Sequence, residues 1–547
     1  MKSMPEQGQI TFVNTAPFSL VPCPLTKFLV LLVTLMIFTS TAFAQGKKII
    51  YVPIDGRPCN LYQVVQVAEK LGYEILTPPV EAIGTRTNMG DTQAMWTWLE
   101  EIAPQADAAV LSTDSLLYGS LVASRTHSLD KQTIMERAQR FKTFHENFPT
   151  LPIYLIGTIM RTPAYNFKGE VPYYETHGAK IFQYTALVDK QEMGLLTSGD
   201  KRKLKKLEAD IPKEYLDDWF MRRAKNSDAN ELFIEYAREG VFQYFLLGCD
   251  DSARFSQTHR ESRKLTELAS DMGKTVVQVT SGADELGMLL VARAINYDRN
   301  LTPFVSVEYN LGTGAETWPR YCNEPIGVSI DAAIIAAGGL QIPSHERADL
   351  VIAVNTRDDG KTFESSNQKK NKLKNRGDVK TFVKILRELT DKNYPVAVAD
   401  ISFSNGADNS LMNQIKRDGL QYKIRAYGGW NTATNSSGFL IGSGVLTPFM
   451  SDKDVAELLT TRYLDDWIYQ ANVRQEIVAA SYSTPGEGTP MNLEEKLPTL
   501  EKLLNERMKE FTAKNLLLPK QWRLEDLKFS LPWQRTFECD PRFKFVG

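Results

Sequence analysis

Short apolar runs alternate with longer stretches of helical periodicity along most of the chain. Near-continuous apolar runs rich in β-branched residues are typical of parallel strands whose two faces are both buried. Stretches such as "DTQAMWTWLEEIA" and "KTFVKILRELTD" instead repeat their apolar residues at helical spacing. The alternation predicts an α/β protein built from parallel βα units. The ten strand-like runs are "KIIYVPID", "YEILTPP", "DAAVLSTD", "PIYLIGTIM", "QYFLLGCDD", "TVVQVTSGADE", "PFVSVEYN", "DLVIAVNT", "PVAVADIS" and "KIRAYGGWN".

The number of these runs exceeds the strand count of a single closed α/β barrel, so part of the chain must form an additional lobe. We expect a barrel-like or doubly wound core, an additional α/β lobe and a helical C-terminal region. The loop-like segment "LQIPSHERAD" supplies the best boundary between the two α/β parts. The predicted organisation is an N-terminal α/β domain over residues 45–345, a second α/β lobe over 346–450 and a helical region over 451–547.

The segment "KFLVLLVTLMIFTSTAFAQG" resembles a cleaved signal peptide. Lys27 precedes an apolar core, and Ala42 and Ala44 have the small-residue spacing of a cleavage site before Gln45. The apolar core is too short to serve comfortably as a permanent membrane span. We therefore expect residues 1–44 to be removed and the protein to be exported to the periplasm or the cell exterior, with no stable membrane span after cleavage.

Composition and charge are those of an ordinary globular protein with a large core. The 547 residues are 43% apolar and 24% charged, and the formal net charge is −2. This balance provides no basic surface field, so nucleic acid is not an expected partner. Two basic runs, "KRKLKKLE" and "NQKKNKLKNRGD", are more typical of solvated faces than of binding patches. The cysteines after residue 45 are widely spaced, which argues against a disulfide framework.

Carboxylates recur where the strand-like runs end. Single acids end three runs, namely Asp55, Asp114 and Asp400. Because the carboxyl ends of parallel strands share one edge of a sheet, acids at these ends are expected to converge. One Asp between a strand and a helix is often only an N-cap, but a second acid beside it adds repulsion unless a cation, a proton or a substrate hydroxyl accommodates it. Paired acids follow the fifth and sixth runs, and the candidate catalytic residues are therefore Asp250, Asp251, Asp284 and Glu285.

Two further segments place amides and an aromatic ring at strand ends. In "RAYGGWNTATNSSG" two glycines favour a tight turn before the Trp, Asn and Thr residues. The segment "DISFSNGADNSL" likewise places Asn and Asp side chains after a strand-like run. A flat aromatic ring beside hydrogen-bonding groups suits a sugar, although a core tryptophan with capping residues is the alternative. The predicted substrate-binding residues are Asp55, Arg57, Asn60, Asp114, Arg125, Arg161, Asp400, Asn405, Asp408, Trp430, Asn431 and Asn435.

Seven motifs together resemble one known family. They are "YVPIDGRPCN", "STDSLLYGSLVASR", "GTIMR", "GCDDSARFSQTHRE", "GADELGMLLVAR", "VADISFSNGAD" and "AYGGWNTATNSSG". In this order they are similar to the bacterial DUF4127 family of domains of unknown function, over nearly the whole chain after the signal segment. The resemblance implies that these segments form one site region, and it implies no reaction.

Several other chemistries lack their motifs in this chain. No G-x-G-x-x-G opens a helix, no complete phosphate loop is found, and neither H-E-x-x-H nor G-x-S-x-G occurs. The leading hypothesis is an exported glycoside hydrolase that acts on an oligosaccharide or another small molecule, with general acid and base drawn from the paired carboxylates. The alternatives are a non-catalytic periplasmic carbohydrate-binding protein and a metal-dependent hydrolase of a non-glycan substrate. No cofactor is expected and no metal site is assigned, although the carboxylates suit a hard divalent cation.

Overall fold

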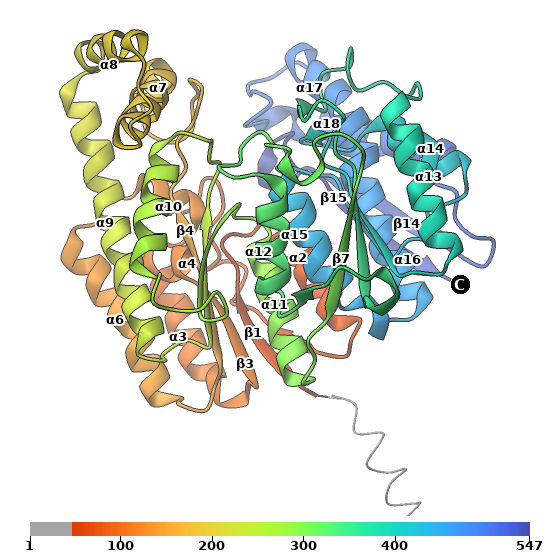
Figure 1. The fold of residues 1–547 in the computed structure, drawn as a ribbon, viewed down its shortest axis with the longest axis horizontal. Coiled ribbons are helices and arrows are strands. Elements are labelled where there is room, and N and C mark those ends of the chain that lie inside the picture. Colours follow the sequence, from red (N-terminus) through yellow and green to blue (C-terminus); the bar gives the residue numbers. More distant parts are fainter. Residues whose placement is uncertain (1–45) are drawn as a thin grey trace, which may run out of the picture. The chain divides into compact units, whose positions relative to one another are not determined.

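Parallel strands form both large sheets of the protein (Figure 1). The structure is a computed structural model that describes residues 46–547, so the predicted signal segment lies outside the described residues. Residues Lys47–Gly547 form one compact unit. Helices flank both sheets, which confirms the predicted α/β class and shows a doubly wound core in place of a barrel.

The first sheet has the strand order β2-β1-β3-β4-β5-β6, and all of its strands are parallel. The central strands β3, β4 and β5 are buried along their whole length, as their near-continuous apolar sequences predict. The bounds are β1 (Lys48–Val52), β2 (Glu74–Leu76), β3 (Ala108–Ser112), β4 (Ile153–Ile159), β5 (Tyr244–Cys249) and β6 (Val277–Ser281).

The second sheet has the order β13-β11-β9-β7-β8, again with every pair parallel. Both sheets have the same type of strand order. In each sheet the strand that comes second in the sequence lies on one side of the first strand (β2 beside β1, β8 beside β7), and the later strands lie on the other side. Such an order creates a switch point between the first and third strands, where ligands of open α/β sheets usually bind. The bounds are β7 (Phe304–Tyr309), β8 (Leu340–Gln341), β9 (Leu350–Val354), β11 (Val396–Ala399) and β13 (Ala426–Gly428).

Three helices lie between the two sheets, namely α11 (Leu286–Asp298), α12 (Ile326–Ala336) and α15 (Ala433–Gly444) (Figure 1). All residues of α15 are buried, and this helix packs against both α11 and α12. Its small residues permit this contact, because a Cβ atom at Gly442 would approach Met288 Cγ to 2.9 Å. The start of α15 lies beside the turn before α11, where a Cβ atom at Gly282 would approach Thr434 Oγ1 to 2.7 Å, and this contact positions the candidate site.

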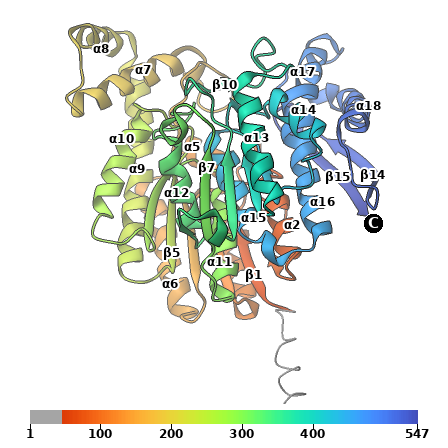
Figure 2. The same ribbon diagram turned by 45° about the vertical axis from the view of Figure 1, so that its right-hand side comes forward.

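The remaining elements complete the two halves (Figure 2). Two strands, β10 (Phe363–Glu364) and β12 (Phe403–Ser404), form a short parallel pair. The other helices are α2 (Tyr62–Glu69), α3 (Thr92–Ile102), α4 (Thr113–Tyr118), α5 (Leu121–Thr126), α6 (Lys131–Asn147), α7 (Tyr174–Glu192), α8 (Ser198–Asp210), α9 (Lys213–Arg238), α10 (Gln257–Leu268), α13 (Gly377–Asp391), α14 (Asn409–Arg417), α16 (Asp452–Arg462), a π-helix (Tyr463–Val473), α17 (Arg474–Ser483) and α18 (Leu497–Asn515). None of the helices within residues 46–547 combines the length and apolarity that crossing a membrane requires.

The chain passes from the first sheet to the second between β6 and β7, before the boundary predicted at residue 345. Both β7 and β8 precede that residue, yet they pair within the second sheet. The segment "LQIPSHERAD" therefore begins with β8 and leads to β9 of the same sheet, whereas the connection between the two sheets runs through α11, which has no turn-rich composition. The C-terminal region contains four successive helices and also an antiparallel strand pair that was not predicted, β14 (Arg523–Ser530) and β15 (Asp540–Val546). The sequences of these two strands, RLEDLKFS and DPRFKFV, contain many charged residues and therefore lack the apolar pattern by which the other strands were predicted.

Candidate functional site

Arg57 joins two carboxylates that follow different strands of the first sheet. Its Nε and Nη2 atoms donate to the oxygens of Asp55, after β1, over 2.8–3.1 Å. Its Nη1 atom donates to Asp284 Oδ2, after β6, over 3.1 Å. Asn60 Nδ2 donates to Asp55 over 2.9 Å and also contacts Asp284. Burial disfavours the ionised form of Asp284, but the charge and hydrogen bonds of Arg57 outweigh burial and lower the Asp284 pKa.

The second sheet contributes amides to the same carboxylate. Asn431 Nδ2 donates to Asp284 Oδ2 over 2.8 Å, and Asn435 Nδ2 lies 3.4 Å from the same oxygen. Asn431 has a left-handed backbone with φ of 60°, which Asn tolerates better than most residues, and it follows the glycines of the turn after β13. Asp284 therefore links the strand ends of both sheets, as the predicted convergence requires.

Glu285 is the neighbouring acid, and its surroundings are different. Its side chain is buried against α15, where a Cβ atom at Gly438 would meet Glu285 Cγ at 2.5 Å. Burial, reinforced by the charge of Asp284, raises the pKa of Glu285 to about 8, so the carboxyl group is neutral at pH 7. It lines a small pocket at the junction of the two sheets, whose lining residues are Cys59, Asp284, Glu285, Gly428, Trp430, Asn435, Ser436, Phe439 and Arg462.

Buried polar atoms around this pocket lack protein partners within the described part of the chain. They are Asn60 Oδ1, Glu285 Oε2, Trp430 Nε1 and Asn435 Oδ1. Folded proteins leave few such atoms unpaired, because each costs about 1–3 kcal/mol. The set contains an indole donor, a protonated acid and two amide acceptors. Hydroxyl groups, which both donate and accept, match this mixture.

The predicted pair Asp250–Asp251 lies in a second ionic cluster, at the ends of β4 and β5. Arg125 Nε donates to Asp250 Oδ2 over 2.9 Å, and Arg161 Nη1 donates to Asp251 Oδ2 over 3.0 Å. Glu170 Oε1 accepts from both arginines, over 2.9 and 2.7 Å. Burial raises the Asp250 pKa to about 6 against the influence of Arg125, and the charges of Asp251 and Asp284 add to the increase. The two clusters are thus electrostatically coupled.

Helix capping does not explain the paired acids. The N-cap of α10 is Ser256, whose hydroxyl accepts from His259 N, and Asp251 lies several residues earlier with a left-handed φ of 37°. The start of α11 has no side-chain cap, so Asp284 does not cap that helix either. The capping alternative is therefore wrong for Asp251 and Asp284.

Other predicted site residues lie outside the pocket lining. Asp408 caps α14 by accepting from Ser410 N, and it is paired with Arg376. Asp400 accepts from the Tyr427 hydroxyl and from Asp408 N, over 2.8 and 2.7 Å. Asn405 Nδ2 donates to Glu364 over 2.8 Å. Asp114 is buried and accepts from the Thr158 hydroxyl over 2.9 Å. These contacts connect segments of the protein to one another.

One family model covers nearly all of these elements, matching residues 49–541. The chain belongs to the DUF4127 family, whose description is a protein of unknown function. No curated protein matches the chain. The DUF4127 match includes all residues of the pocket lining, and it confirms the family resemblance that the seven motifs indicated.

Several residues of this DUF4127 site were not predicted. Arg462 lines the pocket and is paired with Asp466 of the π-helix, and Asp466 Oδ2 accepts from Gly429 N over 2.8 Å. This contact holds the glycine turn before Trp430. The spacing of Arg462 and Asp466 by four residues on one helix was a usable signal. Glu170, between Arg125 and Arg161, had no such signal because its partners are distant in the sequence.

The C-terminal segment also reaches the DUF4127 site. Trp533 has a left-handed φ of 57°, and the Arg57 guanidinium lies 5.5 Å from its ring centroid. Phe537 packs beside Trp430 with their ring centroids 6.3 Å apart. Within residues 46–547, no cluster of three or more His, Cys, Asp or Glu side chains is arranged to hold a metal ion.

Proposed function

We propose that the protein is an exported glycoside hydrolase in which Glu285 is the general acid and Asp284 is an ionised carboxylate that stabilises positive charge. One observation carries the proposal. Glu285 Oε2 is buried without a protein partner in a pocket that it shares with Trp430 and Asn435, while the adjacent Asp284 is held by Arg57.

The chemistry of glycoside cleavage needs two carboxyl groups in different protonation states. A protonated Glu285 donates its proton to the glycosidic oxygen as the bond to the anomeric carbon breaks. Both oxygens of Asp284 already accept hydrogen bonds, so we assign it an electrostatic role towards the positive charge that develops on the sugar. Asp251 does not line the pocket, but its side chain is 35% exposed at the neighbouring strand end, and we assign it as the candidate base that activates water.

The hydrogen-bonding groups of the pocket match the hydroxyl groups of a sugar. The pocket itself holds about 10 Å³, the space of one water molecule, so it must open to admit a sugar ring. Trp430 contributes an aromatic ring and an indole N–H, and the unpaired amide oxygens of Asn60 and Asn435 accept from hydroxyl groups. A non-catalytic carbohydrate-binding protein is the second candidate, because the pocket lies between two sheets of the same strand order. Turnover distinguishes the two candidates.

The experiment uses a chain that starts at Gly46 and retains the compact unit. It is incubated with aryl glycosides and oligosaccharides, with and without a chelator. We expect hydrolysis that the chelator does not change, and a Glu285→Gln loss on the order of 10²- to 10⁴-fold in kcat. The loss should be smaller for aryl glycosides with acidic phenols, because such leaving groups depart without protonation.

Glu324→Gln is a matched control. This glutamate accepts from the Ser329 hydroxyl over 2.7 Å and does not line the pocket, so its neutral analogue should keep nearly full activity. Sugar binding without turnover would support the binding protein instead. Activity that a chelator abolishes would support the metal-dependent hydrolase. N-terminal sequencing of secreted protein tests export: a start near Gln45 is expected, and an intact Met1 in the soluble cytoplasm would contradict it.

A further inference from the structure

The middle of helix α8 carries five positive charges, and the acids Asp200, Glu208 and Asp210 lie towards its two ends. Lys201, Arg202, Lys203, Lys205 and Lys206 are all exposed, and none of them forms an ion pair with any residue in the described range 46–547. Like charges four positions apart, such as Lys201 and Lys205, destabilise a helix by about 0.2–0.5 kcal/mol per pair. Asp210 lies four positions after Lys206 and offsets part of this repulsion, and a negatively charged partner would relieve the rest.

Exposed apolar side chains lie next to these charges. The turn between α7 and α8 contains Met193 and Leu195, which are 42% and 53% exposed. A groove between the two helices has both apolar and charged walls, and its lining includes Tyr184, Val188, Leu196, Leu204, Lys201, Lys205 and Glu208. Cationic and apolar groups thus share one surface, the α7–α8 tip, comprising residues 193–206.

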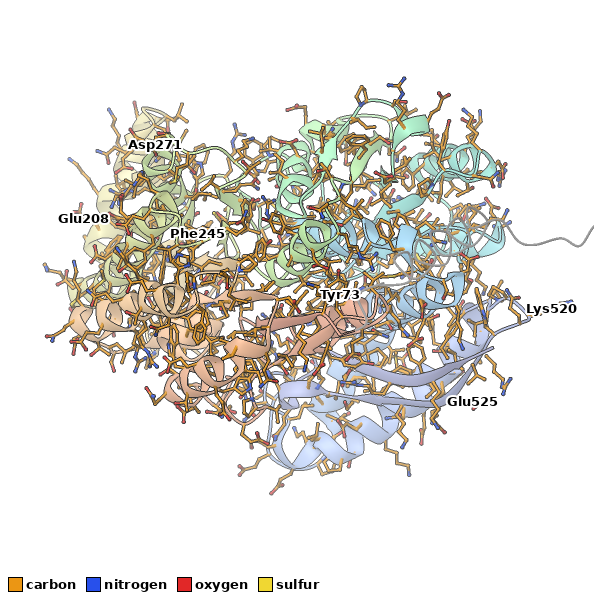
Figure 3. The ribbon with its side chains drawn as sticks, turned by 90° about the horizontal axis from the view of Figure 1, so that it is seen from below. Tyr73, Glu208, Phe245, Asp271, Lys520 and Glu525 are labelled. Carbon is orange, nitrogen blue, oxygen red and sulfur yellow. The ribbon has the colours of Figure 1, made fainter. Side chains whose placement is uncertain are left out.

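The α7–α8 tip is accessible in the fold. The helix α8 packs on α7 and extends beyond the first sheet, at the upper end of the molecule in Figures 1 and 2. Figure 3 shows Glu208 of α8 on the side opposite Lys520 and Glu525 of the C-terminal segment. The α7 helix follows β4, so the tip extends from the strand edge that carries the candidate site.

We propose that the α7–α8 tip docks the protein onto an anionic lipid surface. Lysine and arginine side chains are attracted to acidic headgroups, and neighbouring apolar side chains enter the interface below them. Met193 and Leu195 favour lipid over a soluble acidic polymer, because a polymer offers no apolar layer to receive them. The inference is independent of the reaction at Glu285.

Co-sedimentation with vesicles tests the docking. The chain from Gly46 is mixed with vesicles of phosphatidylcholine alone or of phosphatidylcholine and phosphatidylglycerol. We expect binding only to the anionic vesicles, and weaker binding at high salt. Replacing Lys201, Arg202, Lys205 and Lys206 with Gln should lower the partition coefficient on the order of 100-fold or more. Met193→Ser with Leu195→Ser should also weaken binding.

A matched control uses the second basic run. Gln in place of Lys369, Lys370, Lys372 and Lys374 removes the same number of exposed charges from a loop far from α8 in the sequence, and this variant should bind as the wild type does. Equal binding to both vesicle types, an unchanged α8 variant or an equal loss in the control variant would overturn the proposal. A further combination of results would also overturn it: soluble polyglutamate binds as tightly as the anionic vesicles do, and the serine variant keeps full vesicle binding. An acidic polymer would then be the occupant of the tip.

Discussion

Asp284 and Glu285 are neighbours in the chain, yet Asp284 accepts hydrogen bonds from Arg57 and Asn431 whereas Glu285 Oε2 has no partner among the described residues. The first carboxyl group is ionised because a buried guanidinium compensates its charge. The second stays protonated to about pH 8 because burial outweighs the hydrogen bonds that favour its ionised form. Two consecutive residues thus differ in protonation: Asp284 is ionised and Glu285 is neutral at pH 7.

The pH dependence of stability reports the state of Glu285. Its pKa is raised from 4.5 to about 8 on folding, so between these values the unfolded chain releases a proton that the folded protein keeps. The contribution of Glu285 to the free energy of unfolding is therefore fully present below pH 4.5. It falls by roughly 1.4 kcal/mol per pH unit above pH 4.5 and stops changing near pH 8. Glu285→Gln cannot titrate and should remove this decline, as chemical denaturation across the range would show. Glu81→Gln, at an exposed position, should leave the decline unchanged. The same decline in Glu285→Gln as in the wild type would contradict the raised pKa of Glu285.

Arg57 should be energetically coupled to Asp284. Arg57→Gln leaves Asp55 and Asp284 buried without their cation, which should cost about 3–5 kcal/mol of unfolding free energy. Adding Asp284→Asn should recover part of that loss, with a coupling of about 1–3 kcal/mol in a double-mutant cycle. The exposed pair Lys213–Asp217 provides the control and should show about 0.5 kcal/mol or less. Additive effects at Arg57 and Asp284 would refute the coupling.

Trp430 combines packing with a free indole N–H. It is 4% exposed and packs beside Phe537, so Trp430→Ala should cost about 3–5 kcal/mol of stability. Trp430→Phe keeps an aromatic ring and should cost less, but it removes the unpaired Nε1 donor and should weaken sugar binding. Calorimetry of unfolding and of ligand titration separates the two effects. Unchanged melting of Trp430→Ala would show that packing of this residue is unimportant.

Asp250 and Asp251 should respond differently to amidation. Asp250 is buried against Arg125, so Asp250→Asn should destabilise the protein by about 3 kcal/mol. Asp251 is partly exposed, and Asp251→Asn should change stability by about 1 kcal/mol or less while lowering the rate on the order of 10²-fold if it activates water. Thermal melts and turnover on a confirmed substrate measure both quantities. Near-wild-type turnover in both variants would remove this pair from the catalytic assignment.

Ten of the eleven strands in the two large sheets were predictable because their signal is local, and the exception is the two-residue strand β8. Each of the ten apolar runs contains a strand of the structure, since burial on both faces imposes near-continuous apolar sequence. The assignment of β7 to the second sheet was not predictable. Its sequence, FVSVEY, would suit either sheet, and only the packing of α11 and α15 decides which one it joins.

Part of the site was predictable for the same reason. Asp284, Glu285 and Trp430 follow strand ends in the sequence, and the parallel topology brings such ends together. Asp408 follows the same rule, yet it caps α14 and is paired with Arg376, outside the pocket lining. Position at a strand end is thus common to pocket residues and to residues with structural contacts.

The sequence by itself determined the fold class, the family and the order in which acids, amides and glycines follow the strands. Only the tertiary structure decided which of these side chains share a pocket and which of them carry charge. Ionisation depends on burial and on partners from distant segments: Arg57 lies 227 positions from Asp284 in the chain, and Gly438 of α15 covers Glu285. No local pattern encodes those distances, because they arise only when the two sheets pack around their shared helices.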